Sequence, residues 1–159
     1  MKTKASILGV VGALALAMSL GAYAASPKSA ALQIHHQQRG CHAWSLNGGP
    51  FIVQQSFRLA RNGSLTVTNN DLMVQELVKT SGPAVSMKIV KPGSMTMGAK
   101  MQMGKAAGPY AMAHMGAMLR VTFPSAGIYH FRLVDRGDYF PNIKTIGPDN
   151  KPTLTVTVT

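Results

Sequence analysis

Short segments of alternating polar and apolar residues, bounded by turns, constrain the fold of this chain more than any other feature. Residues 64–68 alternate in this way, and so do residues 118–123. Period-two alternation predicts a strand with one face buried. Similar segments occur at residues 51–59, 75–79, 128–134 and 153–159. With no amphipathic helical pattern of any length, the chain is predicted to be an all-β, antiparallel β-sandwich.

The N-terminal residues have the pattern of a secretory signal peptide. Lys2 and Lys4 precede an apolar run over residues 7–20, and Ala22-Tyr23-Ala24 supplies a small-x-small cleavage site. The apolar run is shorter than the roughly 20 residues that cross a bilayer. We therefore expect cleavage after Ala24, no transmembrane span afterwards, and a periplasmic or secreted protein. Residues 25–40 are predicted to be a flexible lead-in and residues 41–159 a single domain.

Charge and motif content exclude several function classes. The formal net charge is +11, but the basic residues are scattered singly without interleaved aromatics, so nucleic-acid binding is not expected. The five acidic residues form no pair at a spacing useful for hydrolysis. No GxSxG or HExxH motif accompanies the histidines. The chain is therefore not expected to be an enzyme.

Most of the chain's 11 methionines lie between Met87 and Met118. Glycine and proline interrupt this segment, which predicts a long loop over residues 91–110 and one helical turn over residues 111–117. Thioethers are soft ligands that favour Cu(I), and His114 adds a nitrogen donor beside Met112, Met115 and Met118. Alternatively, the methionines fill irregular gaps in a core.

A second candidate site is the Cys41-His42 pair, because thiolate and imidazole both bind copper or zinc. Cys41 is the only cysteine, so it cannot form a disulfide within the chain. Alternatively, Cys41 is a small buried hydrophobe beside a surface histidine. His35 and His36 are expected to be solvated, with incidental metal affinity at most.

Two segments resemble those of the cupredoxin family. SLTVTNNDLMVQELV at residues 64–78 is similar to the first ligand-bearing region, and FPSAGIYHFRL at residues 123–133 is similar to the strand that ends at the copper cysteine. The resemblance covers roughly residues 51–159 and implies a Greek-key sandwich of the plastocyanin and azurin type. By period two, Tyr129 and Phe131 belong in the core with Leu133, and His130 points outward.

The ligand positions depart from the family pattern. Val74-Gln75 stands where a cupredoxin has Pro-His, and Leu133 stands at the cysteine position. A type 1 site requires two histidines and a cysteine with a weak axial methionine, so blue-copper electron transfer is not expected. Gln75 and Met73 remain as weaker donors near the former site.

These observations predict an exported protein that binds copper, in particular Cu(I), for storage, delivery or tolerance. The expected partners are the copper ion and another exported copper-handling protein. We expect the Met-rich loop to close over Gln75 with Cys41-His42 nearby. The candidate ligands, in descending order, are His42, Cys41, His114, Met115, Met118, Met112, Gln75 and Met73. One alternative is a metal-free interaction module on a degenerate scaffold. Another is a redox copper protein with a site rearranged around Cys41.

Overall fold

Eleven β-strands make up the regular structure of the residues that the computed structural model describes, which are 25–36, 42–71, 73–94, 108–136 and 151–159. In chain order the strands are β1 (Ser29–His36), β2 (His42–Leu46), β3 (Phe51–Ile52), β4 (Gln54–Leu59), β5 (Ser64–Asn69), β6 (Gln75–Ser81), β7 (Ser86–Lys91), β8 (Ala111–Met112), β9 (Ala117–Thr122), β10 (Gly127–Asp135) and β11 (Thr153–Val158). Within these ranges there is no helix. The prediction of an all-β fold is confirmed.

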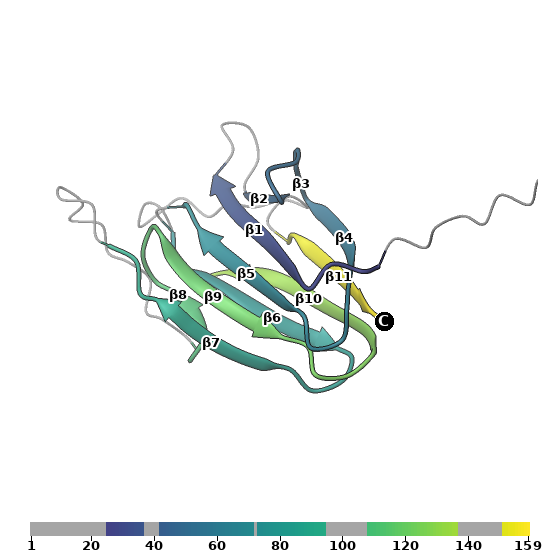
Figure 1. The fold of residues 1–159 in the computed structure, drawn as a ribbon. Coiled ribbons are helices and arrows are strands. Elements are labelled where there is room, and N and C mark those ends of the chain that lie inside the picture. The colour runs from purple at the N-terminus through teal and green to yellow at the C-terminus, as the bar shows by residue number, and fades with distance from the viewer. Residues whose placement is uncertain (1–24, 37–41, 72, 95–107, 137–150) are drawn as a thin grey trace, which may run out of the picture.

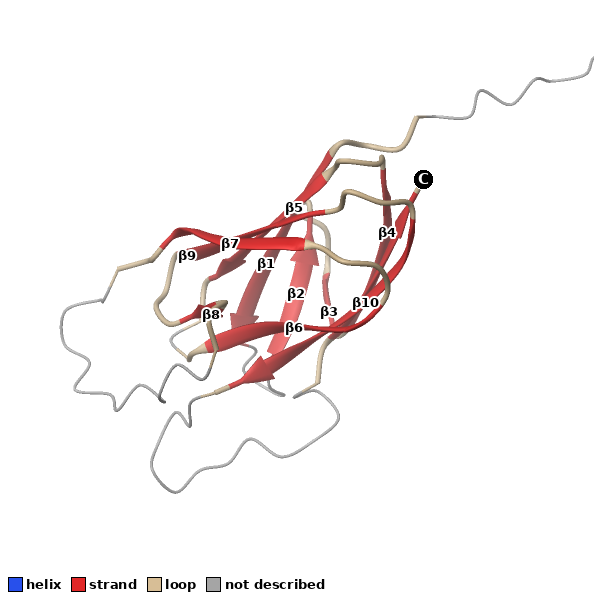
Figure 2. Cartoon of the chain, turned by 90° about the horizontal axis from the view of Figure 1, so that it is seen from below, coloured by secondary structure: helices blue, strands red, loops and turns tan. Residues whose placement is uncertain are grey.

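The strands form two sheets that pack face to face (Figures 1 and 2). Sheet A has the order β3-β2-β1-β5-β9-β7, and sheet B has the order β4-β11-β10-β6-β8. Most neighbouring pairs are antiparallel, but β1 runs parallel to β5 and β4 runs parallel to β11. The sandwich is therefore built from mixed sheets and not from purely antiparallel ones. The alternation of residues within one strand cannot show whether its neighbours run parallel or antiparallel to it. That direction depends on how strands pair across long connections.

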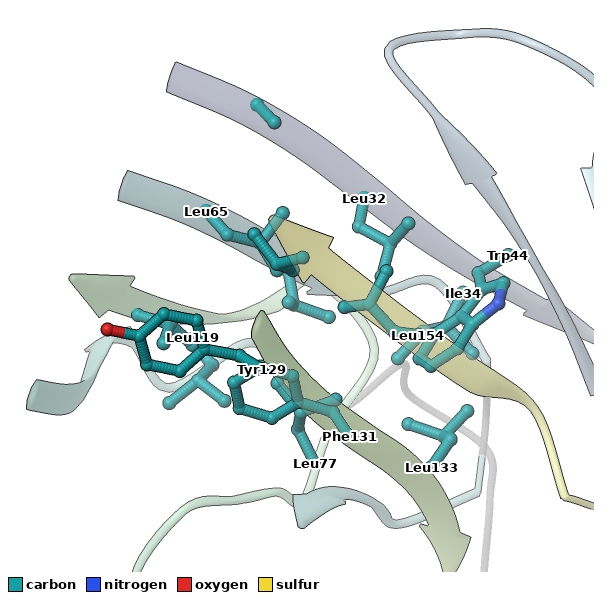
Figure 3. Packing of buried hydrophobic residues seen from close by; sticks show 14 of the residues in the cluster. Leu32, Ile34, Trp44, Leu65, Leu77, Leu119, Tyr129, Phe131, Leu133 and Leu154 are labelled. Carbon is teal, nitrogen blue, oxygen red and sulfur yellow. The ribbon is translucent and has the colours of Figure 1, made fainter. Parts of the chain in front are cut away.

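The core lies between the two sheets (Figure 3). On β10, Tyr129, Phe131 and Leu133 are at most 2% exposed, whereas His130 between them is exposed. Both predictions for this strand are confirmed. The ring of Phe123 meets Tyr129 edge to face, with ring centroids 5.0 Å apart.

The N-terminal boundary of the fold differs from the prediction. Residues 29–36 were expected to belong to a flexible lead-in, but they form β1, which lies between β2 and β5 in sheet A. Leu32 and Ile34 on this strand are fully buried. The prediction is wrong here because the strand is stabilised by neighbours on both sides, and the fold begins upstream of Cys41. Residues 1–24, which are predicted to be a signal peptide, lie outside the described residues, as does Cys41.

The segment after the Met-rich stretch also differs from the prediction. Residues 111–117 were expected to form a helical turn, but Ala111 and Met112 form β8, paired with β6. A tight turn follows, in which the Ala117 amide donates to the His114 oxygen at 3.0 Å. Gly116, its third residue, has a φ of 77°, as a type II turn requires, and this φ is incompatible with a right-handed helix. Residues 95–107 of the predicted loop lie outside the described residues.

None of the described residues belongs to a helix long and apolar enough to span a membrane.

Candidate metal site

The sequence-predicted ligands that the structure describes gather at one end of the sandwich. In sheet A, Ile34 near the end of β1 pairs with Asn69 at the end of β5, and Asn69 pairs with Ala117 at the start of β9. The next strand, β6, begins at this end with Gln75. We call this end, where β1 and β5 finish and β6 and β9 begin, the Asn69 end. It is the end at which a site was predicted.

Asn69 organises this end through its side-chain amide. The residue is fully buried, and its Nδ2 donates to the Met73 oxygen at 2.9 Å and to the Met112 oxygen at 3.0 Å. Its Oδ1 accepts a hydrogen bond from the Asp71 amide at 2.9 Å. An asparagine amide can donate two hydrogen bonds while its oxygen accepts others. Asn69 therefore joins the β5–β6 loop and β8 to the end of β5.

Two predicted ligands, Met73 and Met112, accept hydrogen bonds from this amide through their main-chain oxygens, and a third, Gln75, pairs with Met112. Gln75 is the direct cross-strand partner of Met112 in the β6–β8 pair, and both residues are fully buried. Met73 is 4% exposed, and its backbone is linked to that of Met112 through Asn69. Met112 also belongs to the hydrophobic core cluster. Its packing agrees with the alternative reading of methionine as a core residue, so Met112 alone does not indicate metal binding.

His114 differs from these residues because one of its ring nitrogens is buried and lacks a hydrogen-bond partner in the described part of the chain. Its Nδ1 has no hydrogen-bond partner among the residues that the structure describes. Buried polar atoms nearly always have such a partner, and neutral imidazole is a common metal ligand. His114 begins the tight turn, two residues after Met112 and directly before Met115. A buried nitrogen donor therefore lies in a turn that contains Met115 and follows Met112 in the sequence.

The backbone of this turn is hydrogen-bonded to the segments on either side of it in sheet A, the end of β5 and the residues after β7. The Gly116 amide donates to the Asn69 oxygen at 2.6 Å, and the Ser94 amide donates to the Met115 oxygen at 3.0 Å. Gly93 packs so closely that a Cβ there would lie 2.8 Å from the Met115 oxygen and 2.9 Å from the His114 oxygen. These contacts fix the path of the chain through His114 and Met115.

Met118 is separated from the residues around Asn69. It lies on β9 between the buried residues Ala117 and Leu119 and is itself half-buried. Successive side chains of a strand point to opposite faces, so Met118 lies on the outer face of sheet A while Met112 packs in the core. The structure therefore does not bring Met118 together with Met112.

His42 begins β2 at the same end of the sandwich, where its Cα partner is His36 on β1. Between β2 and β9 lie β1 and β5, so roughly 14 Å separates the two strands at a spacing of about 4.8 Å. His42 and the His114 turn therefore share one end of the fold but occupy different places along it. Cys41 lies outside the described residues.

Among the described residues, no three or more histidine, cysteine, aspartate or glutamate side chains form a group that could hold a metal ion. A site here would therefore need thioether or amide donors in addition to His114.

Sequence reasoning missed Asn69 and the ion pair between Glu76 and Arg136. Leu65, Val67 and Asn69 alternate along β5, so all three side chains face the core. A polar residue at a core position was the sequence signal that could have identified Asn69. Glu76 is 8% exposed, and the Arg136 Nε lies 2.7 Å from its Oε2. The pairing of Glu76 with Arg136 could not be predicted from the sequence, because 60 positions separate the two residues.

No family model matches the chain, and no curated protein matches it. Among solved structures it is similar to reduced rusticyanin, with 10% identity, a TM-score of 0.37, and 86% of this chain and 82% of that chain covered. It is also similar to Fet3p, a multicopper oxidase that functions in iron import, with 7% identity, a TM-score of 0.41, and 81% and 27% covered. The cysteine protease inhibitor EhICP2 from Entamoeba histolytica is similar at 9% identity, with a TM-score of 0.29 and 66% and 85% covered. These values assign no function to the chain.

Proposed function

We propose that this protein binds a copper ion as Cu(I) at the Asn69 end, with His114 as the central ligand. The observation that carries the proposal is the buried Nδ1 of His114, which lacks a hydrogen-bond partner among the described residues. Its neighbours Met112 and Met115 carry thioethers, which bind Cu(I) in preference to hard cations. A nitrogen donor with soft sulfur donors fits a copper site better than a magnesium or calcium site.

The remaining residues of the Asn69 end support this site in different ways. Met73 supplies a further thioether, and the Gln75 amide oxygen is a weaker donor at a buried position. Asn69 does not bind the ion in this proposal, but it holds the Met73 and Met112 backbones together. Cu(I) held in this way serves storage, delivery or tolerance, and delivery requires a second copper-handling protein.

A Cu(I) titration against a competing chelator, in reducing buffer, tests the proposal. We expect His114→Ala to weaken binding at least about tenfold, since it removes the nitrogen ligand, and Met115→Leu to weaken it as well. His130→Ala and Met87→Leu are matched controls, because His130 is exposed on β10 and Met87 packs against the core from β7. Both controls should bind as the unmodified protein does.

Three outcomes would contradict the proposal. Equal Cu(I) affinity in His114→Ala and in the unmodified protein would exclude this site. A strong visible absorption band on adding Cu(II), lost in Cys41→Ser, would favour the redox alternative built on Cys41, since a Cu(II)–thiolate centre is coloured. Absence of any Cu(I) binding would leave the interaction module as the remaining function.

A further inference from the structure

The outer face of sheet A carries basic and hydroxyl side chains over β5, β9 and β7. These three strands lie side by side at one edge of the sheet (Figure 1). Alternate residues of each strand pack in or against the core, so the residues between them face outward. The outward residues form three cross-strand rows, which are Ser64, Thr122 and Ser86, then Thr66, Arg120 and Lys88, then Thr68, Met118 and Lys91. We call this surface the basic face.

Lys88 and Arg120 are directly opposed on the basic face, and both are exposed. Like charges at directly opposed positions of an antiparallel pair destabilise a sheet. No acidic residue in the described part of the chain lies on this face to offset them. Glu76 and Asp135 belong to sheet B, and Asp71 is buried in the loop after β5. The positive charge of the basic face is therefore not neutralised by the described residues.

An exposed apolar side chain lies among these cations. Val90 on β7 is 39% exposed and stands between Ile89 and Lys91, where the register with β9 shifts. The half-buried Met118 is the Cα partner of Lys91. Binding to a membrane surface strengthens both with the apolar area that enters the interface and with the attraction of cations to anionic lipids. The basic face offers both contributions.

Two other occupants fit the basic face less well. A symmetric contact with a second copy of the chain uses the same patch twice, so it would place Lys88 and Arg120 against the same cations. Single-stranded nucleic acids are bound by stacking on aromatic side chains as well as by charge, and none of the outward residues of the basic face is aromatic. An anionic lipid surface requires neither symmetry nor stacking.

We propose that the basic face binds the surface of a membrane that contains anionic lipids, with the headgroup phosphates contacting Lys88, Arg120 and Lys91. Phosphate oxygens accept strong hydrogen bonds from lysine and arginine, and the serine and threonine hydroxyls of the same face are further donors. The N-terminal pattern predicts export, which brings the chain to lipid surfaces outside the cytoplasm. This inference does not rest on the proposed Cu(I) site, because none of the three basic residues is a proposed ligand.

Cosedimentation of the purified protein with lipid vesicles at physiological ionic strength tests the proposal. One vesicle preparation contains phosphatidylcholine alone, and the other contains phosphatidylglycerol in addition. The unmodified protein should bind the anionic vesicles more tightly than the neutral ones, and high salt should abolish the difference. Lys88→Gln and Arg120→Gln should each weaken binding to the anionic vesicles about fivefold, and the double variant about 25-fold.

The double variant with Arg58→Gln and Arg132→Gln is the matched control, because it removes the same charge from exposed positions of sheet B. It should weaken binding less than about twofold, since salt screens charges that lie beyond a Debye length. All variants keep the apolar run at residues 7–20, so differences between them report on the substituted face. The Lys88 and Arg120 variants should unfold at the same or a higher urea concentration, because each removes an unfavourable pair of like charges.

Three results would overturn the proposal. Equal losses in the variant with Lys88→Gln and Arg120→Gln and in the control variant would show that the basic face is not the contact surface. Equal binding of the unmodified protein to both vesicle preparations would exclude recognition of anionic lipids. Capture by immobilised polyglutamate that both substitutions abolish, without any preference for anionic vesicles, would assign the face to an acidic protein instead.

Discussion

The side-chain amide of Asn69 donates a hydrogen bond to the main-chain oxygen of Met112, 3.0 Å away, and thereby joins the end of β5 in sheet A to β8 in sheet B. The same amide bonds the Met73 oxygen. One buried side chain therefore satisfies main-chain groups from two segments that lie far apart in the sequence. Because the segment after Met112 carries His114, the geometry of the proposed copper site depends on a residue that is not a ligand.

Asn69→Ala should lower the free energy of unfolding by about 2–4 kcal/mol, because two buried carbonyl groups and the Asp71 amide lose their partner. Urea denaturation measures the change. Asn70→Ala is the matched control, since Asn70 is half-buried and its side chain contacts His35, and it should cost less than about 1 kcal/mol. Equal effects of the two substitutions would show that Asn69 has no special role at this end.

Gly93→Ala should destabilise the protein by about 2–4 kcal/mol and also weaken Cu(I) binding. Gly93 has a φ of 81°, and an added Cβ would lie 2.7 Å from the Ala117 nitrogen, so strain and a steric clash both act on the His114 turn. Gly116→Ala separates the two causes, because Gly116 has a φ of 77° but no atom within 4 Å of its added Cβ.

Gly116→Ala should therefore cost only the conformational strain, about 1–2 kcal/mol. Thermal and urea unfolding of the two variants provide the comparison. A cost for Gly116→Ala as large as that for Gly93→Ala would show that close packing against the turn does not contribute.

Arg136→Ala should lower the free energy of unfolding by about 1–2 kcal/mol, because it leaves the carboxylate of Glu76 without its ion-pair partner. The Arg136 side chain is 37% exposed, so water and salt screen part of the interaction. The loss should shrink when the urea titration is repeated at high salt. Arg132→Ala, which removes an exposed arginine from β10, is the control and should be near neutral.

Tyr129→Phe should cost about 0.5–1.5 kcal/mol, because it removes only the hydroxyl, which donates to the Ser125 oxygen at 2.6 Å. The ring stays in the core and keeps its contact with Phe123. Tyr110→Phe makes the same chemical change at an exposed position and should be neutral within measurement error. If both variants unfold at the same urea concentration as the unmodified protein, the hydroxyl of Tyr129 contributes nothing.

The prediction of β-strands from alternation succeeded because alternation is a local property of the backbone. Consecutive strand residues face opposite sides, so the burial of Tyr129 and Phe131 and the exposure of His130 followed from their spacing alone. The strand that begins at His42 and the turn that begins at His114 both lie at the Asn69 end. Whether His114 binds metal is a prediction that the Cu(I) titration addresses.

The all-β class and the buried faces of the main strands could be predicted from the sequence. Three further features became visible only in the folded chain: residues 29–36 form a central strand, two strand pairs are parallel, and Asn69 bridges the sheets. The physical reason is the range of the interactions. Alternation is set between adjacent residues, whereas register, strand direction and buried hydrogen bonds depend on partners that only the folded chain brings together.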